Sequence, residues 1–463
     1  GLHHMKSSKA WMGLMLILCF GLVLSACGGN KNNNASPSPS ASEAPAASPS
    51  ESASEEAPKA GSDKAFTIRV GAWFIDDRSY QVAFKQGIED KYKELYPNAK
   101  IQWDITLGLP YFDKLKAQLA SRSAPDVIFY QNQEYVVDGY LEDLSNEPWV
   151  ARLNEAGQTD LQTHFQGKTY ALPMGGSIGG GVWYNKKIFA DLGLQPPKTT
   201  QEFMDVAEAI KQAGITPIAL GFKDAWTAQM FATNWLQPYL FSEDPDFGLK
   251  IYNGEKKLDD PLIQEVFLNF QKMKENDYFN KNALSIDWPQ SAQLFAKGEA
   301  AMIIQGPWMP GANKENIANG GFESFDIGFF PLMDDKGNTA MIIGSNEALG
   351  VNAQTELMQE AKDLVNVVAS PELYGPYLVG GGALTMLSDV SVTYDDPVVS
   401  EVQEAVSKKS LPVRLESYLP TSGANALIDV TTKVVSGVKF TPADLKPMID
   451  SLERDKATVT LPE

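Results

Sequence analysis

Cysteine and histidine are scarce in this chain of 463 residues, and their scarcity excludes several kinds of chemistry. The two cysteines, Cys19 and Cys27, both lie in the N-terminal segment, so the rest of the sequence offers no disulfide, thiolate nucleophile or cysteine-ligated metal site. The three histidines are His3, His4 and His164, which excludes a zinc site with several histidines. His164 alone could serve a Ser-His-Asp triad, but we expect a surface or packing role for it. We expect no metal and no cofactor.

Basic residues and phosphate-binding motifs are also lacking. The chain has 39 lysines and arginines against 58 aspartates and glutamates, for a formal net charge of -19. Such a charge repels nucleic acid, so we expect no nucleic-acid partner. The glycine-rich segments 175–181 and 380–382 lack the spacing of a dinucleotide or phosphate loop. Carboxylates remain plentiful, and a glycoside hydrolase that uses two acidic residues stays open as the enzyme alternative.

The N-terminal segment has the composition of an export signal. Residues 1–4 precede the first methionine, Met5, and are left out of the fold reasoning. Lys6 and Lys9 then precede an apolar run from Ala10 to about Val23, which is followed by small residues. This pattern predicts a signal peptide over residues 1–26. An uncleaved membrane anchor is the alternative, although the run is short for the roughly 20 apolar residues of a spanning helix.

Residues 24–27, Leu-Ser-Ala-Cys, resemble the bacterial lipoprotein box, in which the cysteine becomes the mature N-terminus and carries lipid. Cys27 matches the modified position, and two or more acyl chains such as palmitate give stable anchoring. From Cys27 to residue 65 the chain is rich in Asn, Ser, Pro, Ala and Glu, which predicts a disordered tether. We therefore expect a protein anchored by lipid alone to the extracellular face of a Gram-positive-like cell membrane.

The body of the chain opens with alternating strands and helices. Strands are predicted over 66–73, 100–105 and 126–130, with helices over about 80–95 and 111–121. The first helix should bury a stripe of five apolar residues: Val82, Phe84, Ile88, Tyr92 and Leu95. The third strand is a continuous apolar segment, as in a parallel sheet covered by helices on both faces. This β-α-β-α-β run predicts an α/β domain.

Polar side chains follow the first and third predicted strands. Trp73, Asp77 and Arg78 come after the first strand, and Gln131, Asn132 and Gln133 come after the third. In open α/β sheets, ligands bind beyond the carboxyl ends of the strands. Amides and charges beside an aromatic ring suit a neutral polyol better than a phosphate.

Four motifs in the same order carry a resemblance to a known family. They are Ala-Pro-Asp-Val-Ile-Phe at 124–129, Gly-Lys-Thr-Tyr-Ala-Leu-Pro at 167–173, Tyr-Asn-Lys-Lys-Ile-Phe at 184–189, and Gly-Glu-Ala-Ala-Met with Gly-Pro-Trp between 298 and 308. With the lipoprotein signal, this series resembles family 1 of the extracellular solute-binding proteins of carbohydrate ABC importers, which includes the maltose-binding proteins. The resemblance runs from about residue 66 to the C-terminus.

The resemblance implies an α/β, two-lobed periplasmic-binding-protein-like fold of type II, with the ligand cleft between the lobes. Lobe 1 would hold residues 66–175 and about 330–375, and lobe 2 would hold 176–329 and about 376–463. The glycines between 175 and 181 suit a hinge at the first crossing between lobes, or an ordinary glycine-rich turn.

The resemblance also implies candidate ligand residues. Trp226 and Trp308 match aromatics that stack on sugar, with Asp224 beside the first, while Asp77 and Arg78 match a charged pair that binds hydroxyls. Core packing is the alternative for the aromatics, and a solvated loop for the charged pair. At 133–134 the chain has Gln-Glu where maltose binders often carry an acidic-basic pair, so maltose itself is in doubt. The full set of candidates is Trp73, Asp77, Arg78, Gln131, Asn132, Gln133, Ser177, Asp224, Trp226, Trp288, Trp308, Ser345 and Asn346.

The function that the resemblance implies is binding without catalysis. A monomeric protein would capture a sugar or oligosaccharide by closing its lobes and would deliver it to the permease subunits of an ABC importer. The alternatives are the secreted glycoside hydrolase and a binding protein for a non-sugar solute.

Overall fold

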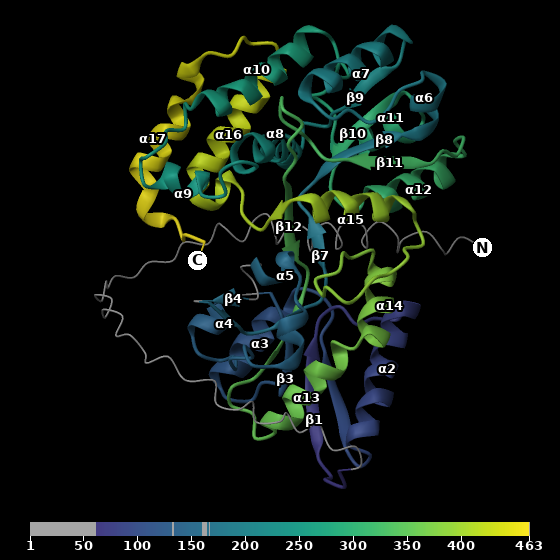
Figure 1. The fold of residues 1–463 in the computed structure, drawn as a ribbon, viewed down its shortest axis with the longest axis vertical. Coiled ribbons are helices and arrows are strands. Elements are labelled where there is room, and N and C mark those ends of the chain that lie inside the picture. The colour runs from purple at the N-terminus through teal and green to yellow at the C-terminus, as the bar shows by residue number, and fades with distance from the viewer. Residues whose placement is uncertain (1–61, 132–133, 160–163, 166, 463) are drawn as a thin grey trace, which may run out of the picture. The chain divides into compact units, whose positions relative to one another are not determined.

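A computed structural model describes residues 62–131, 134–159, 164–165 and 167–462 (Figure 1). The predicted signal peptide, Cys27 and all of the tether up to residue 61 lie outside the described residues, as do Asn132, Gln133 and the side chain of His164. The chain divides into two compact units. Unit 1 consists of Gly1–Ala151, Thr169–Leu172 and Ala348–Tyr377, and unit 2 of Arg152–Lys168, Pro173–Glu347 and Leu378–Glu463. A search of the described helices finds none with both the length and the apolar character that crossing a membrane requires.

Unit 1 is built on a five-stranded sheet in the order β2-β1-β3-β13-β6. The strands are β1 (Thr67–Ala72), β2 (Lys100–Ile105), β3 (Val127–Tyr130), β6 (Leu172–Pro173) and β13 (Ala348–Val351). β1 pairs in parallel with β2 and with β3, and every residue of β3 is buried, so the predicted parallel β-α-β-α-β run is confirmed. The sheet is nevertheless mixed, because β13 returns from far along the chain and pairs antiparallel with β3.

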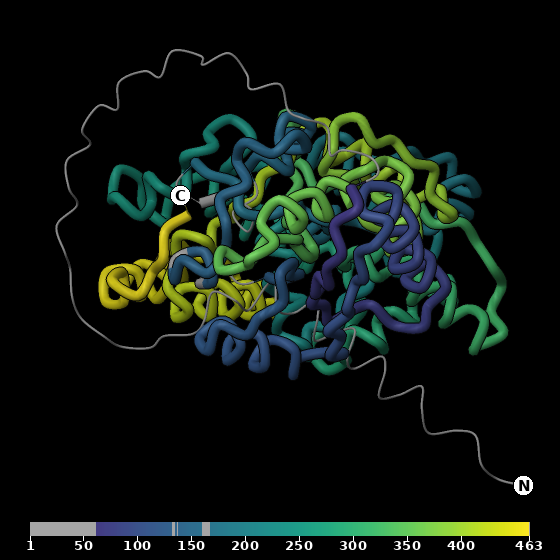
Figure 2. Tube along the Cα trace, turned by 90° about the horizontal axis from the view of Figure 1, so that it is seen from below, coloured from purple at the N-terminus to yellow at the C-terminus, as the bar shows by residue number. Residues whose placement is uncertain are grey.

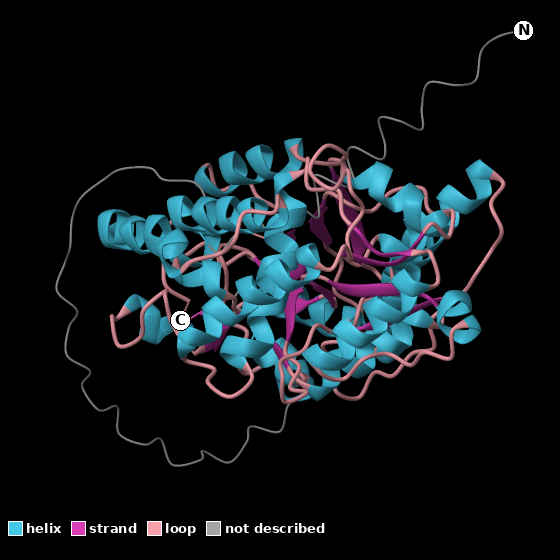
Figure 3. Cartoon of the chain, turned by 90° about the horizontal axis from the view of Figure 1, so that it is seen from above, coloured by secondary structure: helices cyan, strands magenta, loops and turns pink. Residues whose placement is uncertain are grey.

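Helices flank this sheet. They are α2 (Ser79–Leu95), α3 (Pro110–Ala120), α4 (Glu134–Val137), η1 (Pro148–Arg152), α13 (Met358–Val368) and the start of α14 (Pro371–Gly381). Figure 3 shows the helices of the chain in cyan and its strands in magenta. The predicted stripe of α2 is wrong at Val82, which is 52% exposed, because the helix instead buries Gln81, Phe84, Ile88 and Tyr92. These four positions lie at the three- and four-residue steps that define one helical face, and Val82 lies beside that face.

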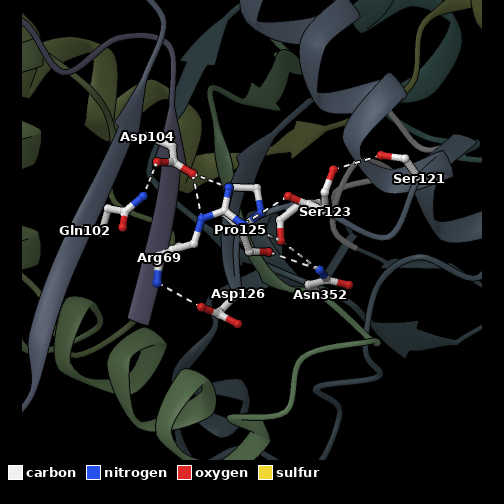
Figure 4. A network of polar contacts seen from close by, with 9 residues as sticks. Arg69, Gln102, Asp104, Ser121, Ser123, Pro125, Asp126 and Asn352 are labelled. Atoms are coloured by element: carbon white, nitrogen blue, oxygen red, sulfur yellow. Dashed lines mark hydrogen bonds and ion pairs between the residues drawn. The ribbon is translucent and has the colours of Figure 1, made fainter. Parts of the chain in front are cut away.

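A polar network joins the strands and a loop of this sheet in unit 1 (Figure 4). The Arg69 guanidinium donates from Nε to Asp104 Oδ2 at 2.9 Å and from Nη1 to the carbonyl oxygen of Ser123 at 3.0 Å. The backbone N–H of Arg69 donates to Asp126 Oδ2 at 2.8 Å, and Asn352 donates from Nδ2 to the carbonyl oxygen of Pro125 at 3.1 Å. One arginine therefore ties β1 to β2 and to the loop that precedes β3.

Unit 2 contains a four-stranded sheet in the order β11-β8-β10-β9. The strands are β8 (Gly181–Asn185), β9 (Thr216–Ala219), β10 (Ala300–Gln305) and β11 (Ile327–Phe330). β10 pairs in parallel with β9 and antiparallel with β8. A three-stranded sheet, in the order β14-β12-β7, is formed by β7 (Gly176–Ile178), β12 (Met341–Ser345) and β14 (Ser410–Leu411), and β4 (His164–Phe165) pairs with β5 (Lys168–Thr169).

The helices of unit 2 surround one large hydrophobic cluster. Phe231 and Trp235 of the long helix α8 pack there against Phe270 of α10. α16, near the C-terminus, also packs on α8 and α10. This end of the chain is yellow in Figure 2. The helices are α5 (Glu155–Thr159), α6 (Lys186–Asp191), α7 (Thr200–Gln212), α8 (Ala225–Phe241), α9 (Phe247–Tyr252), α10 (Pro261–Glu275), α11 (Trp288–Ala296), α12 (Met309–Gly320), α15 (Val398–Lys408), η2 (Leu415–Tyr418), α16 (Thr421–Val435), η3 (Pro442–Leu445), α17 (Lys446–Asp455) and η4 (Lys456–Thr458).

Candidate functional site

The candidate site of unit 2 lies where three segments meet at one edge of its four-stranded sheet. β9 and β10 run in parallel, so their carboxyl ends lie at the same edge. The loop after β9 leads to Trp226 in the first turn of α8, and the loop after β10 leads to Trp308 just before α12. α11 begins at Trp288 and leads into β10. The sheet thus brings together three tryptophans that are far apart in the sequence, at the edge where α/β proteins bind ligands.

The three indole rings touch one another. Their centroids are 5.8 Å apart for Trp226 and Trp308, 6.2 Å for Trp226 and Trp288, and 6.4 Å for Trp288 and Trp308. The interplanar angles lie between 63° and 67°, so every pair is in an edge-to-face arrangement. Trp288 is buried, whereas Trp226 and Trp308 are half-buried. This tryptophan cluster therefore keeps part of two rings open to solvent, as a surface that could stack on an apolar ligand face.

Asp224 holds the cluster in place from within the protein. Its Oδ2 accepts a hydrogen bond at 2.8 Å from the backbone N–H of Trp288, so the carboxylate fixes the start of α11. A side chain at Gly221 would overlap the backbone of Asp287, so only glycine allows the loop after β9 to approach α11 this closely. The structure thus gives Asp224 a positioning contact, which the sequence did not reveal.

Gly306 is the second glycine that the cluster requires. The six-membered ring of Trp308 lies across its Cα, where any added Cβ would overlap ring carbons. The turn is closed by the Met309 N–H, which donates to the Gly306 carbonyl oxygen at 3.2 Å. The Gly-Pro-Trp motif therefore has a local structural reason: glycine leaves room for the ring that follows it.

Three further candidates lie together on the paired strands β7 and β12. Ser177 Oγ donates to Asn346 Oδ1 at 2.5 Å, and the Asn346 N–H donates to the Gly175 carbonyl oxygen at 3.0 Å. Ser345 is fully buried and pairs with Gly176 in the ladder. Ser177 and Asn346 thus present a hydroxyl and an amide side by side, whereas the side chain of Ser345 has no exposed surface for a ligand.

In unit 1 the candidates lie at the carboxyl edge of β1 and β3, which are parallel neighbours. Trp73 is only 2% exposed, and its ring packs within 5.5 Å of the rings of Phe74, Tyr111 and Phe112, so core packing accounts for it. Arg78 Nε donates at 2.9 Å to the carboxylate of Asp76, so an ion pair with the residue two positions earlier holds the guanidinium.

Asp77 is exposed, and Gln131 is half-buried at the end of β3. The side chains that this edge offers to a ligand are therefore Asp77, the half-buried Asp76–Arg78 ion pair and Gln131. This set is polar, and the structure leaves it without an exposed aromatic ring from Trp73.

Two carboxyl groups of unit 2 share a hydrogen bond away from the tryptophan cluster. The hydrogen bond that Glu265 donates to Asp335, together with burial, raises the pKa of Glu265 to about 7. Burial opposes ionisation of Asp335, but hydrogen bonds from Glu265, Tyr239 and Thr200 outweigh it and hold the pKa of Asp335 below its usual value. Tyr239 Oη donates to Asp335 Oδ1 at 2.7 Å. Carboxyl groups in hydrogen-bond contact are closer than the roughly 5 Å of a retaining glycosidase, so this pair is not arranged for glycoside hydrolysis.

The residues that the structure describes contain no group of three or more histidine, cysteine, aspartate or glutamate side chains placed to hold a metal ion.

Comparison with known proteins agrees with the fold. The family model of the bacterial extracellular solute-binding proteins matches residues 76–374. This chain belongs to that family, and its fold is the two-lobed α/β fold of the family.

Among curated relatives, an uncharacterized ABC transporter extracellular-binding protein of Pyrococcus horikoshii is 24% identical over 381 residues, 79% of this chain and 83% of the relative. The multiple sugar-binding protein of Streptococcus mutans is 24% identical over 342 residues, 70% of this chain and 77% of the relative. Among solved structures, the apo form of RafE from Streptococcus pneumoniae has a TM-score of 0.70 at 22% identity and covers 86% of this chain and 99% of its own. RafE in complex with raffinose has a TM-score of 0.61 at 22% identity and covers 85% and 100%.

Proposed function

We propose that this protein captures a sugar or oligosaccharide outside the cell and delivers it to the permease of an ABC importer, without chemical change to the ligand. The observation that carries the proposal is the tryptophan cluster at the carboxyl edge of β9 and β10. Sugars present C–H patches on their faces and hydroxyls at their edges, and the half-buried rings of Trp226 and Trp308 suit the faces.

Polar groups that suit the hydroxyls are found in each unit. In unit 2 these are the hydroxyl of Ser177 and the amide of Asn346, and in unit 1 they are Asp77, Arg78 and Gln131. Hydroxyls both donate and accept hydrogen bonds, so a mixture of amides, hydroxyls and charges matches them. The named relatives that bind multiple sugars or raffinose support the same ligand class. Closure of the two lobes, if ligand contacts come from both units, would be a shift of population toward the bound state.

The lipid anchor at Cys27 and the location at the extracellular face of the membrane are part of the proposal. They are supported by Leu-Ser-Ala-Cys at 24–27 and by membership in an extracellular family. A radiolabelled palmitate incorporation experiment with the wild type and Cys27→Ala would test the anchor. Incorporation that survives the substitution would contradict it.

The ligand class is tested by a thermal-shift screen of the purified protein against glucose, galactose, maltose, xylobiose, raffinose and stachyose, with reducing ends measured in parallel. A ligand that binds the folded state raises Tm by mass action. A rise with one sugar and no new reducing ends would support capture. New reducing ends would make the protein a glycosidase, and no response to any sugar would point to a non-sugar solute.

A further inference from the structure

Buried polar atoms without a hydrogen-bond partner are concentrated beside the tryptophan cluster. Among the described residues nine such side-chain atoms occur, and three of them lie within residues 305–313. They are Gln305 Oε1, Trp308 Nε1 and Asn313 Oδ1. The other six are spread between residues 81 and 416. Because a buried polar group without a partner destabilises the folded state, three in so short a segment require an explanation.

Gln305 stands at the centre of this segment. It is the last residue of β10, immediately before Gly306-Pro307-Trp308, and only 1% of its surface is exposed. Met302 and Ile304 belong to the main hydrophobic cluster of unit 2. Since side chains alternate along a strand, Gln305 points to the opposite face of β10.

That face carries one wall of the tryptophan cluster. α11 packs on β10 and begins at Trp288, and its buried Phe295 lies outside the main hydrophobic cluster. Gln305 therefore lies at the sheet edge from which Trp308 follows, on the side where Trp288 and α11 are found. An apolar side chain at position 305 would complete this core, yet the chain has an amide there.

The unpartnered atoms form a chemically coherent set. The amide oxygen of Gln305 accepts a hydrogen bond, and the indole N–H of Trp308 donates one. A hydroxyl can donate to the first and accept from the second, so the pair matches a neutral polyol rather than an anion or a cation. The glutamine side chain turns about several single bonds, so its amide can change direction without movement of the strand.

We propose that Gln305 is a specificity-determining residue of the sugar site. When a sugar binds, the Gln305 amide turns toward the Trp308 ring and accepts a hydrogen bond from a ligand hydroxyl, while Trp308 Nε1 donates to a ligand oxygen. The unpartnered state of both groups belongs to the ligand-free protein, and the ligand supplies the missing partners. This inference rests on the proposed function and adds a residue that reads a hydroxyl.

The test compares Gln305→Met with Gln237→Met. Gln237 is equally buried and its Oε1 is likewise unpartnered, but its Nε2 donates to the Val413 carbonyl oxygen at 2.7 Å. It lies on a part of α8 three turns beyond Trp226. Tm of the ligand-free protein is measured by scanning calorimetry. Kd is measured by titration calorimetry for the sugar of the screen that raises the wild-type Tm most. Gln305→Met should raise Tm and weaken binding at least tenfold, whereas Gln237→Met should lower Tm and change Kd less than twofold.

Each other outcome overturns a named part of the inference. A lower Tm or a failure to fold for Gln305→Met would mean that Gln305 is paired in the free protein, for example by an internal water. A higher Tm with unchanged Kd would make Gln305 a core residue without a ligand role, while the sugar-binding function would stand. A wild-type protein that binds none of the sugars would refute the function and the hydroxyl-reading role together.

Discussion

Replacement of Trp308 by alanine separates ligand stacking from core packing. The substitution removes two edge-to-face contacts, with Trp226 and Trp288, worth about 0.5–1.5 kcal/mol each. It also removes a buried indole N–H that has no partner in the described part of the chain, which returns about 1–3 kcal/mol. These two terms offset each other to within about 2 kcal/mol, which leaves the lost apolar burial of a half-buried ring. The loss of stability should therefore be smaller than the roughly 3–5 kcal/mol of a fully buried Trp→Ala, and Tm should move by only a few degrees.

Binding should respond more strongly. By analogy with aromatic rings that stack on nucleobases, loss of the ring costs about 1–3 kcal/mol of binding free energy. This corresponds to a Kd that rises roughly 5- to 150-fold. Titration calorimetry with the sugar that raises the wild-type Tm most gives Kd, and scanning calorimetry gives Tm.

The matched control is Trp235→Phe. Trp235 is fully buried in the main hydrophobic cluster of unit 2, and its Nε1 donates to the Met333 carbonyl oxygen at 3.1 Å. Loss of this bond should lower the free energy of unfolding by about 1–2 kcal/mol and leave Kd within twofold of the wild type. The reasoning is refuted if Trp308→Ala binds the sugar as tightly as the wild type while its Tm falls as in a core substitution.

Substitutions at three further positions test contacts that the structure assigns. Asp224→Ala should weaken sugar binding roughly tenfold, because the Trp288 N–H loses its acceptor. Asp224→Asn should bind like the wild type in the same calorimetric titration, since its amide oxygen can accept that hydrogen bond. Equal loss of affinity in both variants would contradict a positioning role for Asp224. The pKa of Glu265 in the folded state, near 7, lies above its ordinary value of 4.5. The contact with Asp335 therefore contributes fully to the stability of the folded state below pH 4.5, and this contribution is lost as pH rises through 7. Glu265→Gln keeps a hydrogen-bond donor at every pH. The free energy of unfolding of the variant minus that of the wild type, measured in urea, should therefore be about 1 kcal/mol more favourable to the variant at pH 8 than at pH 5, a figure reduced for solvent screening. A difference that does not vary with pH would refute the shared proton. Arg69→Met should lower the free energy of unfolding by about 1–3 kcal/mol through loss of the unit 1 network, with unchanged Kd, and a large change in Kd would show that the network shapes the site.

Much of the fold could be predicted from local sequence patterns. The first three strands of unit 1 lie within one residue of their predicted bounds, because a continuous apolar strand such as β3 and a helix that stops just before Pro97 leave a strong local signal. The phase of α2 was misjudged at Val82, since a helix with buried Gln81 carries an ambiguous apolar stripe. The antiparallel return of β13 left no local signal, because its partner β3 is more than 200 residues away in the chain.

The candidate site, like the fold, was predictable from the sequence only in part. The sequence by itself determined the exclusion of thiol chemistry and of a zinc site with several histidines, the alternation of strands and helices, and the aromatic and polar residue types at the ends of strands. Only the tertiary structure decided that Trp226, Trp288 and Trp308 touch, that Trp73 is buried, and that Arg78 pairs with Asp76. Residue type and periodicity are local properties of the chain, whereas ring contacts and ion pairs depend on which sheet edges and loops the folded chain brings together.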